Sequence, residues 1–318
     1  MQPALEDRRG SGTLALKQMV ARHPMAAFLV MTFTFSWLIV GLAILSEPEL
    51  GLLPIRLPAE LFTALASVFG LALPAFLVTA ATGGRSGVRD LLRRSFKGRV
   101  GVRWYLLALL GLLLLTLLAA LALRGTEPLG DLARNWSLLF TMFLPGVLLA
   151  FVFVNLAEEV CWTGFMQHRL QKRVGPLLAS VMVAPAFALV HLPAFFVSGW
   201  ISEERTPFSQ LPAVLLQVGL LAVFAIFVRV LITWLYNGSG QSVIIVALFH
   251  SAFNMVNGQK LTPQLLGLPE PLESLLPQLA VLLLAVFAAS FTRGRLAYKP
   301  EPTAVLAPLP LAAPVAPT

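Results

Sequence analysis

The sequence predicts an all-α protein, a polytopic transmembrane helical bundle of about eight spans with both termini in the cytoplasm. Three observations lead to this fold class. Of the 318 residues, 58% are hydrophobic and only 12% are charged, which is about half the charged share of ordinary soluble domains. The apolar residues also gather in runs of about twenty, the length that a helix needs to cross the hydrocarbon of a membrane. Finally, Lys and Arg residues are concentrated in alternate connecting segments, as in polytopic membrane proteins.

Eight apolar runs carry this prediction, and each should be helical because only helices satisfy their own backbone groups along such runs in lipid. In chain order the runs are 24–46, 61–81, 104–123, 136–167, 176–197, 211–236, 242–256 and 275–291. The first run lacks a small-residue cleavage site, so we expect a retained helix rather than a signal peptide. The fourth run is too long for a simple crossing and should extend into the cytoplasm. The seventh is short and is the weakest candidate for a full span.

The distribution of charge gives the orientation. Seventeen of the 23 Lys and Arg residues fall on one side of the predicted spans and five on the other. The largest group lies between the second and third runs and consists of Arg85, Arg89, Arg93, Arg94, Lys97, Arg99 and Arg103. Since basic loops stay in the cytoplasm, both termini should lie there. The net charge of +8 is therefore a sign of topology and not of nucleic-acid binding. We expect a multi-pass protein of a bacterial inner membrane whose partner is the lipid bilayer.

The domain organisation follows from the same pattern. A cytoplasmic amino-terminal segment should cover residues 1–23, one transmembrane domain residues 24–296, and a disordered tail residues 297–318, where Ala and Pro dominate without a period. No fixed-period repeat is present in the sequence. The single cysteine, Cys161, excludes a disulfide within the chain and any metal site built from several cysteines.

A few polar groups remain inside the predicted spans. They are Glu158, Glu159, His191, Arg229 and His250, with Asn155 and Asn254 as polar companions. Such groups are costly in lipid and generally face a partner, a cavity or a pathway. Glu158 and Glu159 are neighbours on a helix and point about 100° apart, so they should have different roles. Two ionised carboxylates would repel each other there. Either one is protonated, or a cation or several hydrogen-bond donors stabilise the second.

Two histidines on other runs can join these glutamates. His250 and Asn254 are spaced i, i+4, which places both side chains on one helical face. His191 ends the preceding motif, Phe187 to His191, on the fifth run. Titratable groups that converge from several helices favour a functional site. The competing interpretation is a structural hydrogen-bond network in the interior of the bundle.

Taken together, these residues resemble the CPBP (Abi) family of bacterial intramembrane proteases, which includes the type II CAAX prenyl endopeptidases. The family pattern is two glutamates with an arginine four places after the second, usually followed by glycine; a phenylalanine and a histidine four apart; and a histidine followed four residues later by asparagine or aspartate. The matching residues are Glu158, Glu159, Gly164, Phe187, His191, His250 and Asn254. The resemblance places the motif core at 150–257, within a protease domain.

The resemblance implies an endopeptidase that hydrolyses membrane-embedded or lipidated peptides, CAAX-type tails among them. Glu158 would be the general base on water, while His191 and His250 position that water or assist proton transfer. Asn254 would donate to the oxyanion, and Glu159 would orient the site. The set of Glu158, His191 and His250 would also suffice for a catalytic zinc. The cofactor is therefore either none or a divalent metal, and the enzyme is either a metalloprotease or a metal-free hydrolase.

One position departs from the family pattern. Thr163 stands where the family has arginine; it can donate a hydrogen bond to Glu159 but supplies no positive charge. Either Glu159 is neutral, or another cation replaces the arginine, or activity is altered or absent. Arg229 lies roughly 10 Å inside its run, and our hypothesis is that it reaches Glu159. The alternative is that Arg229 extends to the cytoplasmic headgroups.

Two other function classes remain open. A proton-coupled transporter also carries glutamate and histidine inside the membrane. Against a transporter, the ionisable residues cluster on adjacent segments rather than in two related halves. The other class is an inactive membrane scaffold or immunity protein, which Thr163 favours because it replaces a residue of the catalytic pattern.

Overall fold

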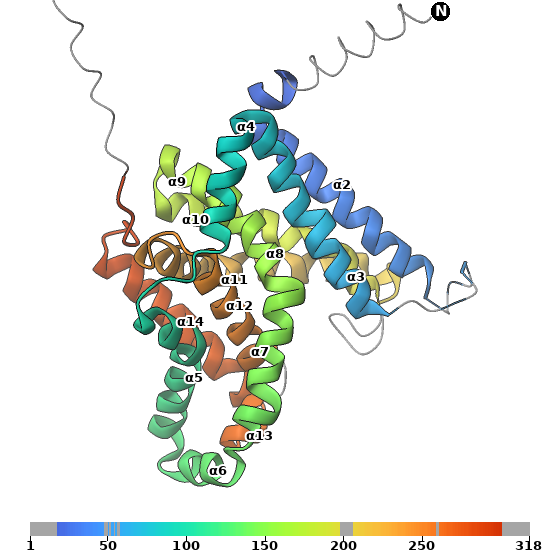
Figure 1. Cartoon of the computed structure of the whole chain (residues 1–318). Coiled ribbons are helices and arrows are strands. Elements are labelled where there is room, and N and C mark those ends of the chain that lie inside the picture. The colour runs from blue at the N-terminus through green and yellow to red at the C-terminus, as the bar shows by residue number, and fades with distance from the viewer. Residues whose placement is uncertain are drawn as a thin grey trace, which may run out of the picture.

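The computed structural model describes residues 18–47, 50, 52–53, 55, 58–197, 206–258 and 261–300. Throughout these ranges the regular elements are helices and no strand occurs (Figure 1), which confirms the all-α fold class. The predicted amino-terminal segment up to residue 17 and the predicted tail from residue 301 lie outside the described residues.

The helices follow one another with few long connections. In chain order they are α2 (Pro24–Leu45), α3 (Ala59–Leu65), η2 (Ala66–Ala72), α4 (Leu73–Ser95), α5 (Val102–Arg124), α6 (Glu127–Asn135), η3 (Leu139–Phe143), α7 (Leu144–Ala150), η4 (Phe151–Asn155), α8 (Leu156–Glu159), η5 (Val160–Gln167), α9 (His168–Val174), α10 (Pro176–Val190), η6 (Leu192–Phe196), η7 (Phe208–Gln210), α11 (Leu211–Gly238), α12 (Val243–Gly258), α13 (Leu261–Leu266) and α14 (Leu272–Phe291). The elements η2 to η5 are π-helical, whereas η6 and η7 are short 3₁₀ turns.

Seven helices among the described residues are long and apolar enough to cross a membrane, one fewer than the eight runs predict. They are Pro24–Leu45, Ala59–Ser95, Val102–Arg124, Leu139–Val174, Pro176–Phe196, Phe208–Gly238 and Leu272–Phe291. The predicted run 242–256 does form a helix, α12, but its 16 residues rise only about 24 Å, less than the roughly 30 Å of a bilayer core. The protein is therefore an integral multi-pass membrane protein in which α12 is short.

The fourth membrane helix is continuous from Leu139 to Val174 and is longer than its predicted run, 136–167, at the carboxyl end. It alternates between α-helical and π-helical segments. π-Helical turns are rare and are found frequently at functional sites. Glu158 and Glu159 end the four-residue segment α8, between η4 and η5.

The second membrane helix ends close to its predicted end at residue 81, because α4 joins two helices across a kink at Gly84. Gly84 has φ 59° and ψ −154° inside α4, a backbone conformation that glycine adopts readily. The helix bends there, as Figure 1 shows, and its second half packs against η5. Of the basic residues that mark this segment as cytoplasmic in the sequence, Arg85, Arg89, Arg93 and Arg94 are therefore helical, whereas Lys97 and Arg99 follow the end of α4.

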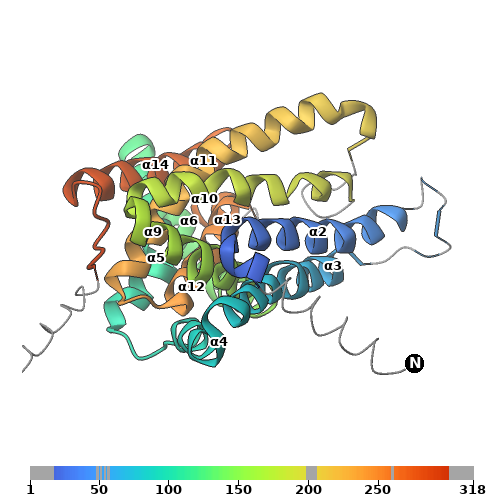
Figure 2. The same cartoon turned by 90° about the horizontal axis from the view of Figure 1, so that it is seen from above.

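The helices bury two large groups of apolar side chains. One group lies mainly between α5, α11, α12 and α14, and the other between α2, α4, η5 and α10. Helices α10 and α11 share the most extensive contact and run side by side in Figure 2. The segment around the two glutamates lies between the groups, because Val160 packs in the first and Cys161 and Trp162 in the second.

Candidate active site

The two neighbouring glutamates of α8 differ in their exposure. The Glu159 side chain is 0% exposed and that of Glu158 is 10% exposed. This difference follows from the helix, which points consecutive side chains in different directions. Of the two carboxylates, only Glu158 keeps contact with the surroundings of the protein.

Glu159 forms a fork-shaped ion pair with Arg229 of α11. Nη1 of Arg229 lies 2.8 Å from Oε1 of Glu159, and Nη2 lies 3.2 Å from Oε2. Thr163 donates its hydroxyl to Oε2 of Glu159 and accepts a hydrogen bond from Nη2 of Arg229 at 2.6 Å. The contact that the sequence predicts between Arg229 and Glu159 is therefore present. The alternative, in which Arg229 extends to the headgroups, is wrong because its side chain is only 1% exposed.

The burial of this pair determines its charge state. A buried charge that loses its partner is strongly destabilising, so two such groups persist when each compensates the other. The guanidinium carbon of Arg229 also lies 5.9 Å from the ring centre of Phe187, within the range of a cation–π interaction. We conclude that Glu159 is an anion held by a cation, although the cation does not come from its own helix.

His250 of α12 lies against both glutamates. Its Nδ1 is 2.9 Å from Oε1 of Glu159 and 3.6 Å from Oε2 of Glu158. A carboxylate can only accept a hydrogen bond, so Nδ1 of neutral His250 carries the proton and Nε2 keeps its lone pair. Glu159 thereby fixes the tautomer of His250, as a carboxylate does in other histidine-containing sites.

Asn155 of η4 connects Glu158 to α12. Its Nδ2 donates to Oε2 of Glu158 at 3.3 Å, and its Oδ1 accepts from Ser251 at 2.9 Å and from Asn254 at 3.4 Å. In the sequence, the spacing i, i+3 from Asn155 to Glu158 indicates a shared face. Ser251 gives no comparable signal, because a lone serine beside a histidine is unremarkable.

His191 stands apart from this hydrogen-bonded cluster. Its Nδ1 donates to the carbonyl oxygen of Phe187 at 2.7 Å. The ring centre of Phe187 lies 4.8 Å from that of His191 and 5.8 Å from that of His250. Phe187 thus connects the two histidines, while within the described residues no hydrogen bond joins His191 to Glu158 or Glu159.

The candidate zinc ligands do not form a metal site. Across the described ranges, which include Glu158, His191 and His250, no three His, Cys, Asp or Glu side chains are close enough to share a metal ion. The Nδ1 of His250 is also engaged with carboxylate oxygens. The donor set therefore does not fit a divalent metal, and we derive the chemistry of the site from the side chains themselves.

A second polar cluster lies next to the site, where α4 meets η5 and α11. Arg94 donates from Nη1 to the carbonyl oxygen of Gly164 at 2.7 Å and to the hydroxyl of Tyr236 at 2.9 Å. Its Nε lies 3.1 Å from Asp90, and the Tyr236 hydroxyl lies 3.1 Å from Nδ1 of His168. The sequence pattern gives Arg94 no role beyond topology. Its buried contact with Gly164, five residues after Glu159, could not be predicted.

Comparison with known proteins agrees with the resemblance in the motifs. A family model described as "Type II CAAX prenyl endopeptidase Rce1-like" matches residues 136–256. This range contains both glutamates, both histidines, Arg229 and every other member of the hydrogen-bonded cluster around them. A comparison with curated proteins finds no match to the chain.

Proposed function

Because residues 136–256 form an Rce1-like domain, we propose that this membrane protein is an endopeptidase that cleaves membrane-embedded or lipidated peptides by means of a water activated by Glu158. The observation that carries the proposal is the difference in burial and in partners between the two adjacent glutamates. Glu159 is fully buried and paired with Arg229, whereas Glu158 keeps 10% of its side chain exposed and, among the described residues, pairs with no Lys or Arg; the nearest imidazole nitrogen, Nδ1 of His250, lies 3.6 Å away.

In the proposed reaction Glu158 is the general base. Asn155 holds Oε2 of Glu158, which leaves the second carboxylate oxygen to accept a proton from water. The hydroxide formed attacks the carbonyl carbon of the scissile peptide bond, and an oxyanion develops on the carbonyl oxygen. A general base of this kind typically contributes about 10²- to 10⁴-fold to the rate.

His250 and Glu159 handle the second proton. With Nδ1 donating to Glu159, the free Nε2 of His250 can take the remaining proton of the water from the hydroxyl of the tetrahedral intermediate and pass it to the leaving amine as the C–N bond breaks. Glu158 then releases the first proton to the solvent, and the product acid leaves as a carboxylate. The imidazolium formed on the way would be stabilised by the carboxylate of Glu159, as in hydrolases that orient a histidine with a buried acid. Arg229 keeps Glu159 ionised for this task.

Asn254 and His191 complete the proposed site. The amide nitrogen of Asn254 has two hydrogens, and only one is engaged with Asn155, so the other can donate to the oxyanion. His191 uses Nδ1 for the Phe187 carbonyl, which leaves Nε2 free to hold the attacking water. His191 would thus be a positioning residue for the nucleophile.

The test is cleavage of a farnesylated CAAX peptide by the full-length protein in liposomes. The rate is measured as the release of the carboxy-terminal tripeptide. Glu158→Gln, His191→Ala and His250→Ala should each lower kcat at least about 100-fold. Glu60→Gln, which changes an exposed glutamate in the same way, should leave the rate unchanged, as should Cys161→Ala.

Other results would point to other functions. Proton-coupled uptake that is lost in these variants, without any cleavage by the parent protein, would indicate a transporter. Binding of a partner protein that survives all three substitutions, again without cleavage, would indicate a scaffold or immunity protein. Wild-type activity in Glu158→Gln would refute the assignment of the base.

A further inference from the structure

The half of α4 that follows Gly84 exposes two different faces. Arg85, Arg89 and Arg93 recur every four residues and form a basic stripe, and Val88, Leu92 and Phe96 form an apolar stripe beside it. Phe96 is 64% exposed and Leu92 41% exposed. A third face, with Leu91, Arg94 and Ser95, is buried against the rest of the protein. The half-helix is therefore fixed on one side and amphipathic on the other.

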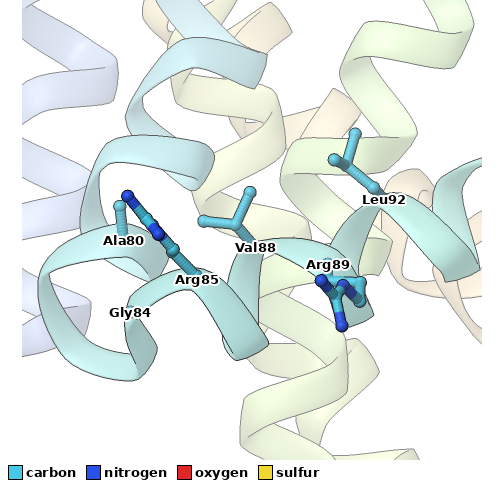
Figure 3. Close-up of a pocket in the computed structure, with 6 residues that line it drawn as sticks. All are labelled: Ala80, Gly84, Arg85, Val88, Arg89 and Leu92. Carbon is cyan, nitrogen blue, oxygen red and sulfur yellow. The ribbon is translucent and has the colours of Figure 1, made fainter.

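A hollow of about 430 Å³ lies along this half-helix (Figure 3). Its lining consists of Ala80, Gly84, Arg85, Val88, Arg89 and Leu92. Two guanidinium groups thus flank a wall that is otherwise apolar. This combination suits a ligand with a negatively charged head and a hydrocarbon body.

The two arginines of the hollow are free to bind such a ligand. The nearby acid, Asp90, is engaged by Arg93 at 2.8 Å and by Arg94 at 3.1 Å. In the part of the chain that the structure describes, Arg85 and Arg89 have no hydrogen-bond or ion-pair partner. Guanidinium groups bind phosphate oxygens in a fork-shaped geometry, so Arg85 and Arg89 are each able to bind a phosphate.

We propose that the hollow binds an anionic phospholipid, with the phosphate between Arg85 and Arg89 and an acyl chain along Val88, Leu92 and Phe96. The source of the phosphate is argued from position. This half-helix follows a membrane-crossing helix in the chain, after the kink at Gly84. A basic and apolar helix at the cytoplasmic surface is the arrangement that attracts anionic lipids.

Lipid binding at this face would also support the neighbouring catalytic helix. On the buried face of the same half-helix, Arg94 donates to the carbonyl oxygen of Gly164 in η5. A ligand that binds only the folded form raises its stability. Bound lipid therefore holds the half-helix against η5, whether or not the protein is a protease.

The experiment is native mass spectrometry of the full-length protein in detergent, titrated with dioleoyl phosphatidylglycerol or dioleoyl phosphatidylcholine. The parent protein should retain phosphatidylglycerol more tightly than phosphatidylcholine. Arg85→Gln/Arg89→Gln should weaken phosphatidylglycerol binding about tenfold or more. The matched control Arg173→Gln/Arg295→Gln removes two exposed cytoplasmic charges elsewhere and should bind as the parent does.

Two further measurements separate the lipid from other ligands. Val88→Ser/Leu92→Ser should weaken lipid retention, and inorganic phosphate in millimolar excess should fail to displace the lipid. Equal melting temperatures without added lipid should show that all variants fold. Parent-like binding in Arg85→Gln/Arg89→Gln, an equal loss in the control, or displacement by free phosphate would each overturn the proposal.

Discussion

At the scale of single residues, the positive charge that pairs with Glu159 belongs to a residue of a different helix. Thr163 stands where the family that the motifs resemble has arginine, and it keeps a hydrogen bond to Glu159, while Arg229 of α11 supplies the cation. The sequence predicts the need for a cation and identifies one candidate. It could not decide between the ion pair and a headgroup contact, because that choice depends on the rotation of α11 relative to α8.

The first prediction concerns the positive charge that pairs with Glu159, which is removed at position 229 and then placed at position 163. Arg229→Ala should abolish most cleavage, because loss of one partner leaves Glu159 buried and unpaired at a cost of about 3–5 kcal/mol. In Thr163→Arg/Arg229→Ala the guanidinium returns to the helix of Glu159, one turn away, and fills the space that Arg229 leaves. The double variant should therefore recover at least about tenfold in kcat and much of the lost melting temperature.

The measurement compares kcat and thermal unfolding of the parent and both variants in the same detergent. Thr163→Val is the matched control, because it removes the hydroxyl but neither adds nor removes a charge, and its effect should be smaller than that of Arg229→Ala. Full activity in Arg229→Ala would contradict the role of the pair. So would a folded double variant that is less active than Arg229→Ala.

The same residues show how far sequence reasoning reaches at this scale. An ionisable side chain inside an apolar run is conspicuous, which is why Glu158, Glu159 and His250 could be predicted to meet. Ser251 could not, since an uncharged hydroxyl in a helix can bond its own backbone and needs no partner. His191 was expected in the same cluster, but the structure connects it to the cluster through the ring of Phe187.

At the scale of helices, the sequence predicts where apolar runs lie better than where helices end. Run 61–81 ends close to the kink at Gly84 that divides α4, but the second helix, which reaches Ser95, was not predicted because it is amphipathic and a hydropathy average does not detect it. The π-helical segments around α8 were also unpredictable. Such turns are rare, and the hydropathy of run 136–167 does not distinguish them from an ordinary α-helix.

The second prediction concerns the crossing of α2 and η2. A Cβ added to Gly70 would lie 2.7 Å from the Cα and 2.9 Å from the backbone nitrogen of Ser36, and closer still to its hydroxyl. These are atoms of a helix backbone and cannot move aside alone. Gly70→Ala should therefore force the helices apart and cost about 1–3 kcal/mol.

Gly41→Ala provides the control for this crossing. A Cβ at Gly41 would meet nothing within 4 Å, and alanine favours a helix over glycine by up to about 1 kcal/mol. Its melting temperature in detergent should equal or exceed that of the parent, whereas Gly70→Ala should melt lower. Equal melting of the two variants would show that the crossing tolerates a wider separation.

At the scale of the whole molecule, the polar site lies between the two apolar groups of the bundle. Helices α11 and α12 bring Arg229 and His250 to it from one group, and α10 brings Phe187 from the other. Neither group alone holds a complete site. This arrangement depends on how the helices pack in the membrane. The sequence predicts the side of the membrane for each connection only from the charges in that connection.

The last prediction tests this orientation with engineered cysteines. The native thiol, Cys161, is free and fully buried, so it should not react with a membrane-impermeant maleimide in the folded protein. Basic loops remain in the cytoplasm, so Arg173→Cys on α9 should be labelled only after the cells are opened. Glu127→Cys on α6 should be labelled in intact cells, because α6 follows α5 on the opposite side. The unsubstituted chain gives the background. Labelling of Arg173→Cys but not of Glu127→Cys in intact cells would show that the topology is the inverse of the predicted one and that the α4 hollow does not face the cytoplasmic leaflet.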